Sequence, residues 1–243
     1  MRIDASGLHY KFLNEKIRQA ALAGEKEIVL ENINGQRYIG AGLRGDVHIK
    51  IFGVPGNDLA AFMDGPTITV FDNGQDGIGN TMNSGKIIIH GDTGDITGYS
   101  MRGGKIFIEG DVGYRVGIHM KSYKESYPVI IIGGRTQSFL GEYMAGGLIV
   151  VLGLKDRNLE ITGSYIGTGM HGGAMYIRGR LKGHQLGKEV KMVELHEADI
   201  KILEGYLTEY CHDFNLQLEE VMSEEFVKLI PYTHRPYGKI YAY

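Results

Sequence analysis

The sequence has one cysteine, Cys211, no tryptophan and only five prolines in 243 residues. A single cysteine can neither close an intramolecular disulfide nor supply a thiolate metal cluster. Neither sign of charge dominates, because 26 Lys and Arg against 29 Asp and Glu leave a formal net charge of −3. That balance gives no cationic field for nucleic acid or an anionic membrane. No apolar run reaches the roughly 18 residues of a membrane span, and the first residues carry no apolar signal segment. We expect a cytoplasmic protein with no nucleic-acid and no membrane partner.

Glycine is the abundant residue, at 37 of 243 positions. With so little proline, neither collagen nor a Pro/Gly-rich disordered tract fits. The glycines follow a repeat, G-x-x-M-x-x-G, with methionines at Met63, Met82, Met101, Met120, Met144 and Met170; Ala60 replaces the first glycine before Met63, and the second glycine follows most but not all of the methionines. The first four methionines are 19 residues apart, and the two longer steps of 24 and 26 hold insertions. One insertion runs from Lys121 to Pro128, and the other lies between Gly153 and Gly163 and includes Lys155, Asp156 and Arg157. A fixed period of this length predicts a repeat architecture.

A short apolar alternation follows each methionine, and a period of two residues predicts a strand. Its two inward columns are Ile49, Ile68, Ile87, Ile106, Ile130, Ile149, Met175 and Ile51, Val70, Ile89, Ile108, Ile132, Val151, Ile177. The glycines exclude a helical repeat, because each costs a helix interior roughly 1 kcal/mol. The sequence therefore predicts an all-β fold: a right-handed parallel β-helix, a single-stranded solenoid of about seven rungs with short α-helical segments at both termini. Steps of 19 exclude the left-handed coil built from multiples of six residues.

We expect one structural domain in three parts, because the open ends of a β-helix need caps. Residues 1–38 are predicted to form an N-terminal helix, Leu8 to Ala23, and a capping strand, Glu27 to Leu30. Residues 39–182 form the parallel β-helix. Residues 183–243 form a C-terminal helical cap and a Tyr-rich tail. The cap contains a helical stripe, Ile200, Leu203, Leu207, Tyr210 and Phe214, and a short helix from Ser223 to Ile230 that ends at Pro231.

An outward column between the two inward ones is apolar in five successive rungs: Ile88, Phe107, Ile131, Val150 and Tyr176. An apolar stripe of this length is rarely exposed to water in a monomer. Two explanations of how this stripe is buried remain open at this point. Either the C-terminal helix of the same chain packs on the stripe, or another subunit does so.

We predict no catalytic, cofactor-binding or metal-binding residues. The segments Gly40 to Gly45 and Gly167 to Gly172 match G-x-G-x-x-G, but a strand follows each where a dinucleotide site needs a helix. His48, His90, His119 and His171 lack metal-ligand spacing, and the turn carboxylates Asp92, Asp95 and Asp111 do not continue across the rungs as a calcium ladder would. A polysaccharide-cleaving enzyme would need carboxylates grouped with basic residues such as Arg102 and Arg115. Cys211 is expected to pack inside the helical stripe.

The repeat G-x-x-M-x-[GS]-G-x-I-x-I-x-G occurs from Gly79 to Gly91, from Gly98 to Gly110 and, with Val151 at the second isoleucine position, from Gly141 to Gly153. It resembles the glycine-repeat (GXGXG) C-terminal domain of the glutamate synthase large subunit. A related repeat occurs in the C subunit of formylmethanofuran dehydrogenase. The lead-in from Ala20 to Leu43 is similar to the glutamate synthase segment before the first rung and favours that branch. The resemblance covers roughly residues 10 to 230.

The resemblance implies a non-catalytic scaffold of a glutamate synthase, produced as a separate polypeptide. The chain opens with Met1, Arg2 and Ile3 and lacks the N-terminal cysteine and cluster cysteines of the family's catalytic domains. The expected partners are glutaminase and FMN-binding synthase polypeptides, which together convert glutamine and 2-oxoglutarate to glutamate. FMN and an iron–sulfur cluster are expected in those partners, and no cofactor in this chain. The alternatives are a subunit of a formylmethanofuran dehydrogenase-type complex, a homo-oligomer, or a free-standing binding protein or carbohydrate-active enzyme.

Overall fold

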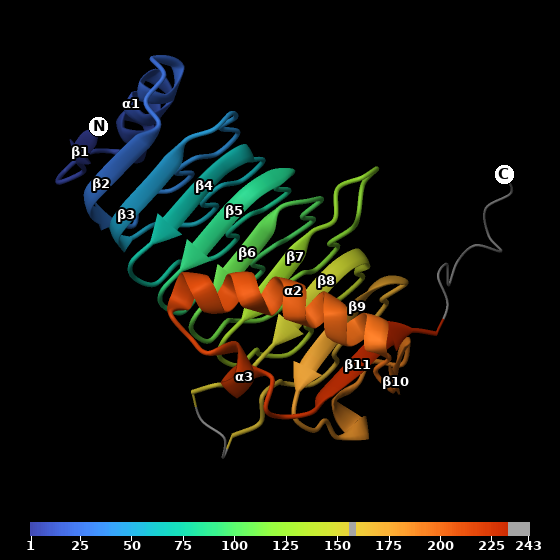
Figure 1. Cartoon of the computed structure of the whole chain (residues 1–243). Coiled ribbons are helices and arrows are strands. Elements are labelled where there is room, and N and C mark those ends of the chain that lie inside the picture. The colour runs from blue at the N-terminus through green and yellow to red at the C-terminus, as the bar shows by residue number, and fades with distance from the viewer. Residues whose placement is uncertain (156–158, 233–243) are drawn as a thin grey trace, which may run out of the picture.

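The structure is a computed structural model that describes residues 1–155 and 159–232. Its strands and helices follow in the order β1 Arg2–Asp4, α1 Tyr10–Leu22, β2 Glu27–Asn34, β3 His48–Val54, β4 Asp64–Val70, β5 Ser84–Ile89, β6 Lys105–Ile108, β7 Val129–Ile132, β8 Ala145–Val151, β9 Gly172–Arg178, the 3-10 helix η1 Gly183–Gln185, β10 Val190–Val193, α2 Glu197–Phe214, α3 Leu218–Val221 and β11 Phe226–Pro231. Figure 1 shows the strands stacked in chain order along one axis, with α1 at one end and α2 across one face.

The backbone winds into a parallel β-helix, as the repeat predicts. Strands β1 to β9 lie in sequence order in one sheet, and β3 to β9 provide seven rungs separated by six turns. Neighbouring rungs are in register, so that Ile87 pairs with Ile106 and Ile130 with Ile149. Strand β2 adds a rung before these, because Ile28 pairs with Ile49 in the same parallel manner. The equivalent apolar residues therefore form continuous ladders inside the coil.

These ladders fill the interior of the coil. Both inward columns and the six methionines of the repeat are at most 1% exposed. The residue three positions before each methionine turns the backbone at a corner with positive φ; it is Ala60 in the first rung and glycine in the other five, as at Gly98 with φ +73°. An added Cβ at Gly98 would lie 2.4 Å from Cδ1 of Ile130 in the next rung, closer than two carbon atoms can pack. Glycine is needed there for backbone conformation and for space.

Helix α2 covers the outer apolar stripe. It begins after His196, whose backbone N–H donates to Asp199 Oδ2 at 2.9 Å, and ends at Asn215 in the left-handed conformation. Its buried residues join the stripe in a second core cluster, which contains Ile88, Phe107, Ile131, Val150 and Tyr176 together with Leu203, Leu207, Tyr210, Cys211 and Phe214. The stripe is thus buried by the chain itself, and its interpretation as an interface for another subunit is wrong.

Polar contacts hold α2 in register over the rungs. The Tyr210 hydroxyl donates to the backbone oxygen of Ile108 at 3.0 Å. Lys86 on β5 forms ion pairs with Glu209 at 2.7 Å and with Asp213 at 2.5 Å, both on α2. These contacts join segments more than 100 residues apart and orient the helix across the strands in Figure 1.

Two details of the predicted C-terminal cap are wrong. The segment from Ser223 to Ile230 is not a helix, because β11 pairs antiparallel with β9 and with β10. The last rung would otherwise present a row of unpaired backbone groups, and this demand outweighs the local helical pattern. On α2, Ile200 is 37% exposed, whereas Asp199 is 4% exposed and accepts the Tyr176 hydroxyl at 2.6 Å. At the start of α2 the buried residue is therefore Asp199, and Ile200 does not belong to the buried face of the helix.

The expected terminal helix and strand are present at the other end as α1 and β2. Leu13, Ile17 and Ala20 of α1 pack on the end of the coil, so this helix closes the first rung. The division at residues 38 and 182 remains a prediction. Asp156, Arg157 and the tail beyond Tyr232 lie outside the described residues.

Candidate functional site

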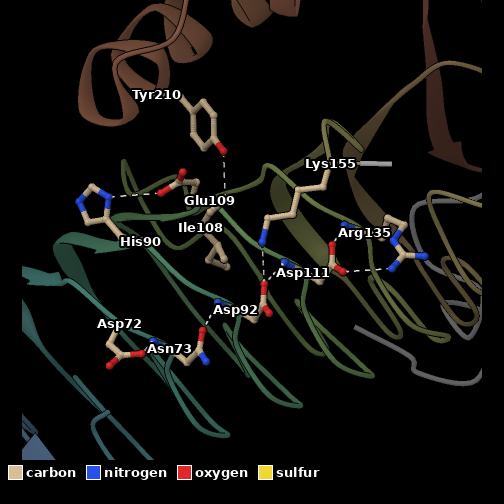
Figure 2. Close-up of polar contacts among 10 residues, drawn as sticks. All are labelled: Asp72, Asn73, His90, Asp92, Ile108, Glu109, Asp111, Arg135, Lys155 and Tyr210. Carbon is tan, nitrogen blue, oxygen red and sulfur yellow. Dashed lines mark hydrogen bonds and ion pairs between the residues drawn. The ribbon is translucent and has the colours of Figure 1, made fainter. Parts of the chain in front are cut away.

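A ladder of polar side chains runs along one corner of the coil, and Figure 2 shows its members. Asn73 Oδ1 accepts the backbone N–H of Asp92 at 2.8 Å, Asp92 Oδ1 accepts that of Asp111 at 2.8 Å, and Asp111 Oδ1 accepts that of Arg135 at 2.8 Å. A parallel ladder links Asp95 to its neighbours, because Asp95 Oδ1 accepts the backbone N–H of the next rung at 2.8 Å. The carboxylates singled out in the sequence therefore join one rung to the next.

Cations partly neutralise this corner. Lys155 contacts Asp92 Oδ1 at 3.0 Å, and Arg135 Nη2 contacts Asp111 Oδ2 at 3.2 Å. Burial alone would raise the pKa of Asp92, but the N–H of Asp111 and the Lys155 ammonium together lower it below its ordinary value. Within residues 1–155 and 159–232, no three His, Cys, Asp or Glu side chains are grouped to hold a metal ion.

The four histidines lie in separate places. His48 Nε2 contacts Thr69 Oγ1 at 2.9 Å, and burial, followed by the Lys50 ammonium, lowers the pKa of His48. His90 lies 3.3 Å from Glu109 (Figure 2) and stacks on Phe71 at a centroid distance of 5.2 Å. His171 Nδ1 lies 3.2 Å from a nearby backbone oxygen, that of Gly169. His119 belongs to a separate aromatic stack.

Both G-x-G-x-x-G segments are turns of the coil. The first leads into β3 and the second runs directly into β9, so a strand and not a helix follows each. Cys211 is 4% exposed in the cluster under α2, and burial raises the pKa of its thiol. Among the described helices, none is long and apolar enough to cross a bilayer.

The structure also brings together residues that the sequence did not group. We call this set the aromatic turn surface: Tyr99, Arg102, Arg115, His119, Lys121, Phe139, Tyr143 and Tyr165. His119 stacks on Tyr143 with centroids 5.2 Å apart and contacts Tyr99 edge-on at 6.0 Å. Phe139 stacks on Tyr165 at 5.0 Å. The surface lies on the turns between rungs, away from the strand face that α2 covers.

Arg115 joins the two stacks. Its guanidinium lies 4.8 Å from the ring centroid of Phe139, and its Nε donates to Glu142 Oε2 at 2.8 Å. Glu142 immediately precedes Tyr143 and is only 8% exposed. Arg102 occupies a different position of the repeat, is exposed, and does not share the Glu142 carboxylate with Arg115. The two arginines are therefore not grouped around a shared pair of carboxylates.

The backbone of this surface is unusual for bulky residues. His119, Phe139, Tyr143 and Tyr165 have positive φ, between 52° and 67°. This conformation costs a residue with a Cβ roughly 1–2 kcal/mol. A stacked aromatic pair returns about 0.5–1.5 kcal/mol, so the two stacks together return less than the backbone strain of the four residues costs. The fold gains little from these rings.

The repeat itself carries the signal that sequence reasoning missed. The position before each methionine holds Phe62, Thr81, Ser100, His119, Tyr143 and finally Gly169. This position faces outward in successive rungs, so aromatic residues at it form a column on the surface. Reading the outward columns of the turns as carefully as the inward columns of the strands would have found the set.

A family model described as the GXGXG motif matches residues 26–233. An uncharacterised protein of Methanocaldococcus jannaschii is 47% identical over 249 aligned residues, which span 99% of this chain and 95% of that protein. A chain of the formyltransferase/hydrolase complex (FhcABCD) from Methylorubrum extorquens, solved in complex with methylofuran, has a similar fold, with a TM-score of 0.62. That chain is 20% identical, and the match covers 84% of the present chain and 72% of the other. The glycine corners, the stacked methionines and the family match agree: the chain belongs to the GXGXG motif family.

Proposed function

We propose that the chain is a non-catalytic scaffold subunit of a glutamate synthase, which packs against glutaminase and FMN-dependent synthase polypeptides. The observation that carries the proposal is the GXGXG repeat over residues 26–233, together with the lead-in from Ala20 to Leu43, which resembles that of glutamate synthase. In this role FMN and the iron–sulfur cluster belong to the partner chains, and this chain supplies no group to the reaction.

The architecture suits a spacer. Six turns separate β3 from β9, which at a strand spacing of about 4.8 Å gives a coil roughly 29 Å long. Each rung is hydrogen-bonded to the next, and the interior ladders are closed to water. Such a rod resists bending because its core is close-packed. It would hold a glutaminase and a synthase at a fixed separation and so limit the escape of ammonia.

Co-expression tests the proposal. The chain is produced with the glutaminase and FMN-binding synthase polypeptides encoded in the same genome, and the mixture is separated by size-exclusion chromatography. We expect a stable complex in which glutamine-dependent glutamate synthesis requires this chain, whereas synthesis from added ammonia does not. Elution of the chain alone, with unchanged glutamine-dependent activity in its absence, would exclude the proposed role.

A second candidate is a structural subunit of a formylmethanofuran dehydrogenase-type complex. The fold shared with a chain of the formyltransferase/hydrolase complex, at a TM-score of 0.62, favours it. Co-expression with the subunits of such a complex distinguishes the two candidates, because the chain is expected to assemble with only one set of partners.

A further inference from the structure

The rungs of a solenoid act as an internal comparison, because equivalent positions must satisfy the same backbone geometry. The position before the methionine has φ +70° at Gly169, and the position five residues before the methionine has φ +71° at Gly77. Glycine therefore meets the backbone requirement of the turn at both of these repeat positions. In the later rungs the same places carry His119 and Tyr143, and Arg115, Phe139 and Tyr165. These larger side chains serve something other than the turn.

The rings remain accessible in the folded chain. Tyr143 is 42% exposed and Tyr165 is 58% exposed. Gly169 lies under the ring of Tyr143, since a Cβ there would be 2.3 Å from Tyr143 Cδ1. The ring thus contacts its neighbours on one side while part of it remains exposed to solvent. Exposed tyrosines and arginines are among the residue types that dominate binding energy in protein interfaces.

The charge beside the rings is positive and unbalanced. Arg102 and Lys121 occupy the same exposed position in successive rungs, about 4.8 Å apart along the coil. Neither forms an ion pair with any described residue, whereas Lys50, Lys86 and Lys155 each contact a carboxylate. Like charges in facing positions of adjacent strands repel each other. Glu142 cannot neutralise them, because it is buried and paired with Arg115.

We propose that the aromatic turn surface docks an acidic segment of a separate protein subunit. Carboxylates of that segment would pair with Arg102 and Lys121, and an apolar side chain would pack on the edges of Tyr143 and Tyr165. The inference rests on the proposed function, since it names the face through which the scaffold holds a partner. It differs from the apolar stripe under α2, which the chain itself has covered.

The test compares two matched double variants. Arg102→Glu with Lys121→Glu reverses the charge of the surface, and Lys11→Glu with Lys16→Glu reverses two exposed charges on α1 at the far end of the coil. Affinity for the purified glutaminase and synthase polypeptides is measured by biolayer interferometry at several salt concentrations. We expect the first variant to bind one of the polypeptides at least tenfold more weakly with a smaller salt dependence, and the control to bind as the wild type does. Tyr143→Gly, which copies Gly169, is expected to weaken binding without lowering the melting temperature.

Failure of the two proposals is distinguishable. If the wild-type complex forms and Arg102→Glu with Lys121→Glu binds equally well, the docking surface is wrong and the proposed function stands. If the wild type binds neither polypeptide, the proposed function is wrong. The surface is then tested with the copolymer poly(Glu,Tyr) in a fluorescence anisotropy assay, with poly(Lys,Tyr) as the control of opposite charge. Equal binding of poly(Glu,Tyr) by wild type and the charge-reversed variant would overturn the inference. So would a homodimer that the charge reversal dissociates, because the occupant would then be a second copy.

Discussion

The corner glycine Gly98 offers a direct test of how tightly the rungs pack. An alanine there meets two separate costs. The backbone has φ +73°, which costs a residue with a Cβ roughly 1–2 kcal/mol. The new Cβ would also lie 2.4 Å from Ile130 Cδ1, and overpacking of a filled core costs typically about 1–3 kcal/mol. We expect Gly98→Ala to lower the free energy of unfolding by about 2–5 kcal/mol.

Gly42 provides the matched control. It has φ +64°, and no atom lies within 4 Å of an added Cβ. Gly42→Ala therefore meets the backbone cost alone, and we expect a loss of roughly 1–2 kcal/mol. The two alanine variants separate the conformational cost from the packing cost within one protein.

A double-mutant cycle identifies the atom responsible. Ile130→Val removes the Cδ1 methyl group that the new Cβ would strike, and alone it should cost about 0.5–1.5 kcal/mol. In the Gly98→Ala background the same change relieves the clash, so we expect a favourable coupling of about 1–2 kcal/mol. Urea denaturation monitored by circular dichroism measures all four proteins. Equal losses for Gly98→Ala and Gly42→Ala, with no coupling to Ile130, would refute the stacked interior.

Three further predictions concern α2 and the turns. Tyr210→Phe removes the hydroxyl that donates to Ile108 O, which still accepts Gly133 N–H at 2.7 Å; thermal denaturation should show a loss of about 1 kcal/mol, and no loss would contradict the helix position. Tyr143→Gly exchanges a stack for relief of backbone strain, so the free energy of unfolding should change by less than about 1 kcal/mol; a larger loss would mean that the ring supports the fold. Burial would raise the pKa of Asp199, but hydrogen bonds from His196 N–H, Lys228 and Tyr176 lower it to about 2; its stabilising contribution is present above the ordinary pKa and is lost as pH falls from about 4 to 2. Asp199→Asn should remove that part of the acid dependence, and an unchanged pH profile would contradict it.

The sequence predicted the coil because a solenoid is built from local repetition. Each rung contacts only its neighbours, so the 19-residue period, the columns of Ile87, Ile106 and Ile130 and the corner glycines determine the fold without knowledge of distant contacts. The pairing of Ile87 with Ile106 confirms this inference. The prediction that the chain has no catalytic, cofactor or metal site concerns chemistry, and it remains a prediction.

Features that depend on distant segments could not be read from the period. Whether α2 or another subunit covers Phe107 depends on where the chain returns after the last rung, and only the folded structure places Tyr210 against Ile108. The segment around Phe226 is a strand because it pairs with the otherwise open edge of β9. The local sequence pattern carries no information about that pairing. The aromatic turn surface likewise arises when residues 19 to 26 positions apart are stacked side by side. The repeat determined the rod, and tertiary packing decided which of its faces is closed and which remains open.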